Sequence, residues 1–441
     1  MIDGVRVTNE RLISTSGLSL VGALLRKTNL KKRIDEVKLK PNEDPDIKTS
    51  EIVSAYIGLL SQGKSHFDNV KEMAADPDFY CKALEIENIP SSETLRQRLD
   101  IIEDKLDVVI TEENINLLKN NNAILTPCID EYIALDVDVT PCDNSKTKKE
   151  GVSRTYEGFD GYAPILAYIG AEGYLINAEL RPGSQHCQKN TVQFLEKIIL
   201  LSKKLTNNPL LVRMDSGNDS KDNIVLFSKK ETACDYIIKR NIRSEGHEMW
   251  LDVAKDYHKK NFQPRDGKSI YTGSVQWLVP GENFKKRVVF EVIERTIKAD
   301  GQCLLIPDIE VNTWWTSLDD YSEEVIIELY HAHGTSEQFH SEIKHDMDLE
   351  RFPSGRFKTN SLVLKLAIIA YNTLLLIGQM SLNCSNGILR NNVSRRRIKT
   401  VIQNLILIAS RVVSHARKTY LNLGCSNAWI PTFKMIYELL E

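Results

Sequence analysis

The sequence has no cysteines at short spacing. Its eight cysteines are scattered and no Cys-x2-Cys motif occurs among them. Structural zinc sites and disulfide-stabilised secreted domains usually depend on such pairs, so both classes are disfavoured. The sequence also lacks a basic segment followed by an apolar one near its start, which a signal peptide would have. We therefore expect a protein of the reducing cytoplasm.

Long uninterrupted apolar runs are scarce as well. The most apolar window, residues 361–380, contains Lys365 and Asn372 and is broken by Gly378. Charged side chains are costly inside a bilayer, so we interpret this window as the buried helix of a globular protein and expect no membrane association. A length of 441 residues with 27% charged residues suits a soluble protein of several domains.

Acidic residues are missing from one long stretch. No Asp or Glu occurs between Arg351 and Tyr437, whereas thirteen Lys and Arg residues do. Such a stretch favours a polyanionic partner, because cations that bind phosphates release counterions. Alternatively, it covers acidic neighbours within the same fold. Within it, residues 394–399 (SRRRIK) are a candidate phosphate-contacting segment through Arg395, Arg396 and Arg397.

The first part of the chain is predicted to be helical. Apolar residues recur at three- and four-residue spacing in residues 16–37 and 49–73. Ser91 or Ser92 is a candidate N-cap for a further helix that ends near residue 110. We expect residues 1–125 to form a helical N-terminal region, either a DNA-binding head or a plain scaffold.

From residue 126 the apolar period changes to two, which is typical of strands. Strands are predicted near 130–140, 163–170, 173–183, 209–217 and 235–241, with helices after the third and the fourth. This order predicts a mixed α/β layer over residues 126–242. Residues 243–320 are predicted to be a β-rich insertion, residues 321–385 to complete the α/β domain, and residues 386–441 to form a basic helical C-terminal region.

Two aspartates stand where apolar strands end. Asp138 closes one strand, and Asp215 follows another at a Gly-containing loop. Ligands of open α/β sheets gather at strand ends, although an Asp there is also a common turn or cap residue. Asp136 has the same strand parity as Asp138, so both side chains face the same side and Asp136 is an alternate candidate.

A third acid is predicted on a helix. In residues 330–345, Tyr330, His333, Glu337 and Lys344 share one helical face. A Gly at position 334 costs a helix about 1 kcal/mol, which leaves a helix start after it open. Two aspartates and a glutamate would suit two Mg²⁺ or Mn²⁺ ions that catalyse phosphoryl transfer. The alternative is a surface helix with a Glu–Lys stripe.

Two further groups of side chains have a structural and a functional interpretation. His331, His333, His340 and His345 crowd the same helix, where a zinc site is the less favoured alternative. Trp277, Trp314 and Trp315 lie in or just after the predicted insertion. A tryptophan there could stack on an unpaired DNA base, although core packing is the preferred interpretation.

The order of these motifs resembles a known family. It comprises 138-DVT-140, 214-MDSG-217 and Tyr-x2-His-x3-Glu-x6-Lys over residues 330–344. It is similar to the DDE transposases of bacterial insertion sequences that carry a Tyr-x2-Arg-x3-Glu-x6-Lys signature. Residues 180–186 (LRPGSQH) and 409–417 (ASRVVSHAR) look like the thirteen-eighty group of these elements. The likeness covers roughly residues 50 to 420.

The resemblance implies a ribonuclease-H-like catalytic domain, interrupted by a β-rich insertion and flanked by helical regions. It implies Mg²⁺-dependent cleavage at the inverted-repeat ends of an element and joining of those ends to target DNA, by a homodimer associated with the bacterial nucleoid. Asp138, Asp215 and Glu337 match the metal-binding acids, and Thr140 favours Asp138 over Asp136. Tyr330 and Lys344 match DNA-contacting residues of the signature.

One residue departs from the signature, because His333 stands where the family has arginine. Histidine lacks the forked guanidinium that binds phosphate and is mostly neutral near pH 7. Two alternatives therefore stay open beside an active transposase. One is a DNA-binding descendant without catalysis, and the other is a metal-dependent nuclease that only hydrolyses DNA.

Overall fold

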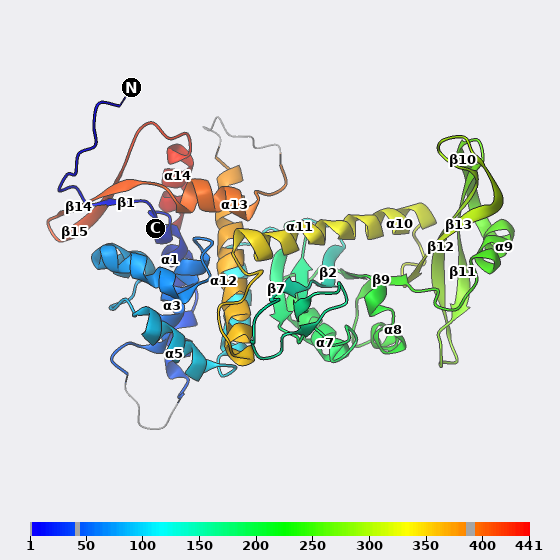
Figure 1. The fold of residues 1–441 in the computed structure, drawn as a ribbon, viewed down its shortest axis with the longest axis horizontal. Helices are drawn as coiled ribbons and strands as arrows, with labels where there is room; N and C mark the ends of the chain where they lie inside the picture. Colours follow the sequence, from blue (N-terminus) through cyan, green and yellow to red (C-terminus); the bar gives the residue numbers. More distant parts are fainter. Residues whose placement is uncertain (1, 40–44, 385–392) are drawn as a thin grey trace.

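The computed structural model describes residues 2–39, 45–384 and 393–441. It is elongated: helices and both termini lie at one end, a large sheet at the centre, and long strands at the other end (Figure 1). The expected boundary between residues 385 and 386 falls outside the described residues.

The central sheet contains the predicted α/β layer. Strands β2 (Ile133–Val139), β6 (Ile165–Ile169) and β7 (Tyr174–Glu179) are antiparallel neighbours, whereas β8 (Leu210–Met214) and β9 (Asp235–Arg240) run parallel to β2. Their spatial order is β7-β6-β2-β8-β9. Three antiparallel strands followed by two parallel ones beside the first confirm the expected ribonuclease-H-like arrangement. Helices α7 (Thr191–Ser202) and α8 (Lys221–Ser228) follow β7 and β8, as predicted.

The predicted insertion extends this sheet instead of forming a separate layer. It begins with a helix that the sequence analysis missed, α9 (His247–Tyr257), which buries Trp250, Leu251 and Ala254. Four antiparallel strands follow: β10 (His258–Arg265), β11 (Lys268–Leu278), β12 (Lys285–Ile297) and β13 (Cys303–Thr316). The end of β13 pairs with β9, which joins the insertion edge to edge with the central sheet.

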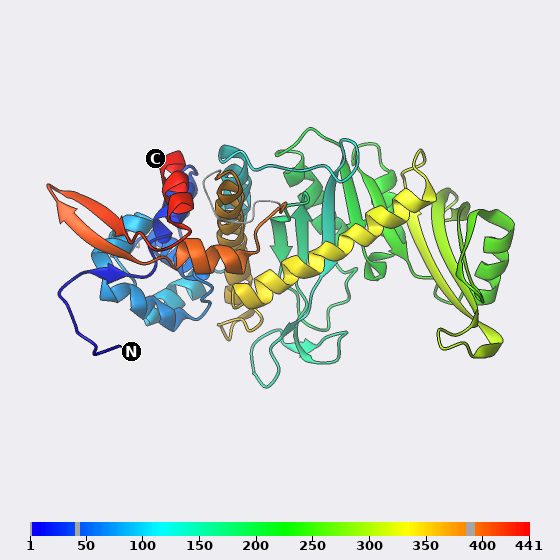
Figure 2. The same ribbon diagram turned by 90° about the horizontal axis from the view of Figure 1, so that it is seen from above.

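The predicted helix after the insertion extends on both sides of Gly334. It comprises α10 (Glu323–His331), a 3-10 turn (Ala332–Thr335), α11 (Ser336–Ser341) and a π turn (Glu342–Asp346). Ser322 caps its start by accepting a hydrogen bond from the amide of Val325. The glycine is absorbed in the 3-10 turn, and the helix crosses the sheet as one rod (Figure 2).

The apolar window became a buried helix, as predicted. Helix α12 (Phe357–Leu382) is long and apolar enough to cross a membrane, but 94% of its most apolar window is buried inside the protein. It packs against β7 together with α6 (Asp107–Asn120). Asn372 of α12 and Asn114 of α6 bond each other, and both amides donate to the carbonyl of Leu175.

The helical N-terminal region is observed, with Ser91 rather than Ser92 as the cap of α5. Its helices are α1 (Leu18–Arg26), α2 (Leu30–Glu36), α3 (Thr49–Leu60), α4 (Pro77–Leu84) and α5 (Ser92–Ile102). A small sheet of β3 (Cys142–Asp143), β4 (Ser153–Arg154) and β5 (Asp160–Tyr162) follows β2.

The expected all-helical C-terminal region was wrong in part. Between α13 (Ile398–Val401) and α14 (Ile430–Leu440) lies a hairpin of β14 (Ser410–His415) and β15 (Lys418–Leu423). Strand β14 also pairs with β1 (Leu12–Ile13). Tertiary pairing with a distant segment therefore outweighed the weak local preference of this stretch.

Candidate active site

Asp138 and Asp215 lie side by side at the ends of two parallel strands. The register pairs Val137 of β2 with Met214 of β8, so the next residue of each strand is one of the two aspartates. Burial first, and the charge of Asp138 second, raise the pKa of Asp215 above its ordinary value. The sequence prediction that both acids share one edge of the sheet therefore matches the backbone geometry.

Each aspartate is held by a local hydrogen bond. Asp138 accepts from the backbone amide of Val139 at 2.7 Å, and its other oxygen lies 3.1 Å from His340 Nε2. Asp215 accepts from Asn218 Nδ2 at 2.8 Å. Burial alone would raise the pKa of Asp138, but the hydrogen bond and charge of His340 lower it. The two neighbouring carboxyls thus have pKa values shifted in opposite directions.

Asp136, the alternate candidate, lies deeper and has other partners. Its two oxygens each lie 2.7 Å from the forked guanidinium of Arg213, and His333 Nδ1 lies 2.8 Å from the first of them. Arg213 also donates to the carbonyl of Leu329 at 2.8 Å. Burial would raise the pKa of Asp136, but the charges of Arg213 and His333 lower it. This carboxylate is enclosed in a buried ion pair.

Glu337 lies on the helix that covers these aspartates. It follows His333 by four residues and precedes His340 by three, and both histidines contact aspartates of β2. Its own side chain is exposed and forms no ion pair or hydrogen bond with the described residues. Nowhere in the described part of the chain do three His, Cys, Asp or Glu side chains already form a group that could hold a metal ion.

The two other signature residues lie on the same rod. Tyr330 is half-buried against Trp314, with ring centroids 5.6 Å apart. Burial, and after it the charges of Asp215 and Asp138, raise the pKa of Tyr330. Lys344 lies in the π turn and is half-buried.

Sequence reasoning missed three side chains at this site. Tyr156, in the turn between β4 and β5, donates its hydroxyl to the carbonyl of Val139 at 3.1 Å. Burial and the charges of Asp138 and Asp215 raise its pKa. Arg213 and Asn218 were missed as well. The signal for Arg213 was its place inside an apolar strand, because a buried arginine requires an acidic partner.

The three consecutive arginines have partners within the protein. Arg395 forms a forked ion pair with Glu342 at 2.8 and 2.7 Å and lies over the ring of Phe339. Arg396 bonds Ser381, and Arg397 bonds both oxygens of Asp346. These contacts fasten the C-terminal region to the helical rod that carries Glu337. The predicted contact of Arg395, Arg396 and Arg397 with DNA stays a prediction.

The three tryptophans of the insertion pack against other side chains, although Trp277 is only partly buried. Trp314 and Trp315 are buried, and Trp277 stacks on Trp250 with ring centroids 5.0 Å apart. The guanidinium of Arg240 lies 5.2 Å from the Trp315 ring and 5.5 Å from the Trp277 ring. Their position matches the core-packing interpretation.

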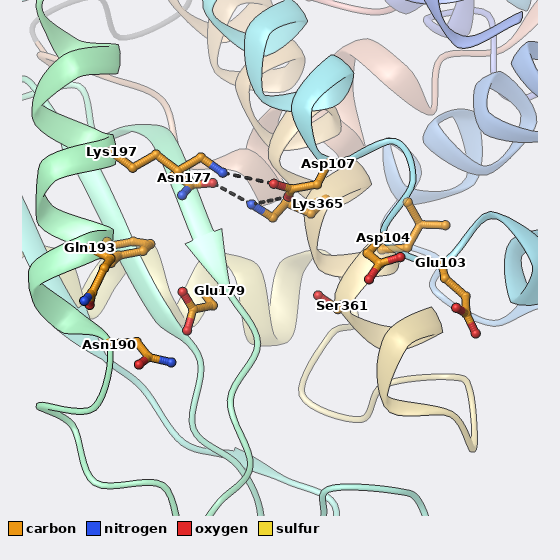
Figure 3. A pocket seen from close by; sticks show the side chains of 12 residues that line it. Glu103, Asp104, Asp107, Asn177, Glu179, Asn190, Gln193, Lys197, Ser361 and Lys365 are labelled. Carbon is orange, nitrogen blue, oxygen red and sulfur yellow. Dashed lines mark hydrogen bonds and ion pairs between the residues drawn. The ribbon is translucent and has the colours of Figure 1, made fainter. Parts of the chain in front are cut away.

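Figure 3 shows a cavity of about 600 Å³, whose lining includes neither Asp138 nor Asp215. Its walls come from α7, α12, β7 and the turn before α6. Lys365 of α12 reaches Asp107 at 2.7 Å and the amide oxygen of Asn177 at 2.7 Å, and Lys197 reaches the same Asp107 at 3.0 Å. These bonds explain how the apolar helix carries a charged residue.

Comparisons with known proteins identify the family. A family model described as "Transposase DDE domain group 1" matches residues 4–441. No curated protein sequence matches the chain. A cryo-EM structure of piggyBac transposase in a synaptic complex with hairpin DNA is similar at 12% identity, with 90% of this chain and 82% of that chain covered and a TM-score of 0.41. Because the family model spans nearly its whole length, the chain belongs to the DDE transposases and is a DNA transposase.

Proposed function

We propose that Asp138, Asp215 and Glu337 are the catalytic acids and that they bind two Mg²⁺ ions, which Mn²⁺ can replace. The observation that supports this most is the register of β2 and β8, which brings Asp138 and Asp215 to the same edge of the sheet. Glu337 lies above them on a helix whose histidines already contact β2.

The donor set fits a hard cation. Burial first, and the charge of Asp138 second, raise the pKa of Asp215, so a bound cation would relieve the cost of two neighbouring buried carboxylates. Carboxylate oxygens are the ligands that Mg²⁺ prefers. Glu337 has no competing partner among the described residues, so a change of its rotamer costs no existing bond. When bound, such ions activate an attacking oxygen and stabilise the leaving oxygen of a phosphodiester.

The remaining side chains position these acids and the DNA. His340 orients Asp138, and the Asp136–Arg213–His333 network fixes β2, β8 and the helix to one another. We assign His333 this positioning role, because it is buried against Asp136. Tyr330 and Lys344 are proposed to contact the DNA near the cleaved phosphate, as the signature implies.

The finer identity rests on the resemblance of motifs. We propose that the substrate is a bacterial insertion sequence of the thirteen-eighty group, whose inverted-repeat ends the enzyme cuts and joins to target DNA. Two ends must be brought together, so we propose that a homodimer acts at the nucleoid.

The test uses the full-length protein with a labelled DNA end from its own locus, a target duplex and Mg²⁺. Wild type should cut at the element boundary and yield joined products, whereas Asp215→Ala and Glu337→Ala should bind the DNA without cutting it. Glu328→Ala is the matched control, because Glu328 is an exposed acid of the same helix. Its cutting should equal that of wild type.

Three outcomes would contradict parts of this proposal. Cutting by Asp215→Ala or Glu337→Ala at the wild-type rate would refute the assignment of the acids. Cut but never joined DNA would indicate a nuclease that only hydrolyses. Binding without cutting by wild type would indicate a descendant that has lost catalysis.

A further inference from the structure

The tip of the β14–β15 hairpin carries cations with no acidic partner. Arg417 and Lys418 are exposed, and neither of them forms an ion pair or side-chain hydrogen bond with the described residues. No Asp or Glu occurs anywhere in the sequence from 351 to 437. Tyr420, 51% exposed, stands two residues beyond Lys418. The hairpin therefore presents uncompensated positive charge beside an exposed aromatic ring.

The base of the hairpin is anchored, whereas its tip projects. Strand β1 pairs with β14, and the amide of Val412 donates to the carbonyl of Arg11 at 2.8 Å. Lys82 of α4 bonds the Thr419 hydroxyl at 2.8 Å, and Ser16 bonds the Ser410 hydroxyl at 2.8 Å. Because Thr419 pairs with Ser414, only residues 415–418 lie beyond these contacts. The hairpin lies at the end of the molecule opposite the insertion (Figures 1 and 2).

The turn sets the direction of the tip. Ala416 and Arg417 have φ values of 47° and 66°, so both central residues of the two-residue loop adopt the left-handed conformation. Two such residues form the turn whose twist matches that of paired strands. An Ala and an Arg do not favour this conformation as Gly and Asn do, so the pairing of the strands holds the loop in place.

We propose that this hairpin tip is a second DNA-contact surface that binds the phosphates of duplex DNA outside the cleavage site, independently of sequence. A two-stranded β-ribbon fits a DNA groove, and Arg and Lys are the usual phosphate contacts. A bilayer is the less suitable partner, because Tyr420 is the only large hydrophobic side chain of residues 411–423 that is exposed. An acidic protein surface, including that of a second copy, is the other class that the test must separate.

The proposal rests on the transposase function only for the identity of the polyanion, and its main readout is DNA binding under conditions without cleavage. Full-length protein would be titrated with a labelled duplex in Ca²⁺ or EDTA over a series of salt concentrations, and binding followed by fluorescence anisotropy. The test variant is Arg417→Gln/Lys418→Gln. The control is Lys229→Gln/Lys230→Gln, an adjacent exposed pair after α8 that loses the same charge.

The loss of two phosphate contacts should lower the slope of log affinity against log salt by about 2 and the affinity at moderate salt by roughly tenfold. The control variant should keep the wild-type slope, and Arg417→Lys/Lys418→Arg should keep it as well. The loss should be equal on duplexes with and without the element end. Cleavage of DNA at saturating concentration should be unchanged, so failure of catalysis and failure of this surface give different results.

Two results would overturn the proposal. One is a test variant whose salt slope equals that of wild type. The other is a slope that changes only together with self-association in sedimentation experiments, which would assign the tip to an interface between copies. Thermal unfolding of every variant at the wild-type midpoint would show that the hairpin stays folded.

Discussion

The two aspartates of β2 provide the sharpest test, because they are two residues apart and have different surroundings. Asp136→Asn removes the charge that faces Arg213, and these two side chains are only 3% and 6% exposed. A buried charge that loses its partner typically costs about 3–5 kcal/mol. Asparagine keeps the shape and one acceptor, so we expect a loss near the lower limit, about 3 kcal/mol of unfolding free energy.

Asp138→Asn should behave in the opposite way. The Asp138 side chain is 22% exposed, and its charge repels Asp215. Loss of that repulsion offsets the weaker bond from His340, so stability should change by less than about 1 kcal/mol. Cleavage, however, should disappear, because this carboxylate is proposed to bind metal.

Urea unfolding in EDTA, followed by circular dichroism, measures the unfolding free energy of both variants. Cleavage of a labelled element end measures their activity. The double variant Asp136→Asn/Arg213→Met should regain most of the stability, because it leaves no buried unpaired charge. The reasoning fails if Asp136→Asn is as stable as wild type, or if Asp138→Asn is the variant that loses stability and still cuts DNA.

Burial and a neighbouring carboxylate raise the pKa of Asp215, so its ionisation disfavours folding at neutral pH. Asp215→Asn should therefore be more stable than wild type at neutral pH in EDTA, with a gain that vanishes in acid. Asp107→Asn should lower the unfolding free energy by about 2 kcal/mol at neutral pH, because it leaves the buried Lys365 ammonium without its carboxylate. This loss should shrink at alkaline pH, because burial lowers the pKa of Lys365 and the side chain then becomes neutral. Gly173→Ala should lower the unfolding free energy, measured by denaturant unfolding, by about 2–3 kcal/mol, and it should also slow DNA cleavage. The reason is that φ of Gly173 is +72° and an added Cβ would lie 2.4 Å from the Phe339 ring. An unfolding midpoint equal to that of wild type at neutral pH would contradict the expectation for each of these three variants.

Local periodicity was enough to predict the two strands that end at Asp138 and Asp215. The alternation around Asp138 and the apolar run before Asp215 reflect strands whose side chains enter a core, and that pattern is written in neighbouring residues. The same is true of α12, whose apolar surface is continuous. Even the β-rich character of the insertion was visible, although α9 was hidden because only three of its residues are buried apolar contacts.

Contacts between distant segments decided the rest. Strand parity places Asp136 and Asp138 on one side, and only the pairing of β2 with β8 sets Arg213 beside Asp136 and Asp215 beside Asp138. Strand periodicity does not distinguish the two aspartates, because their different partners depend on the register between two strands.

The C-terminal region shows the same limit. The sequence by itself determined that Arg411 to Lys418 is basic and free of acids, since composition needs no fold. Only tertiary structure decided that these residues form a hairpin, because β14 is completed by β1, and Ser16 and Ser410, which bond each other there, are 394 positions apart. Charge and periodicity are local properties of a chain, whereas the pairing of strands and of buried ions is settled only when distant segments meet.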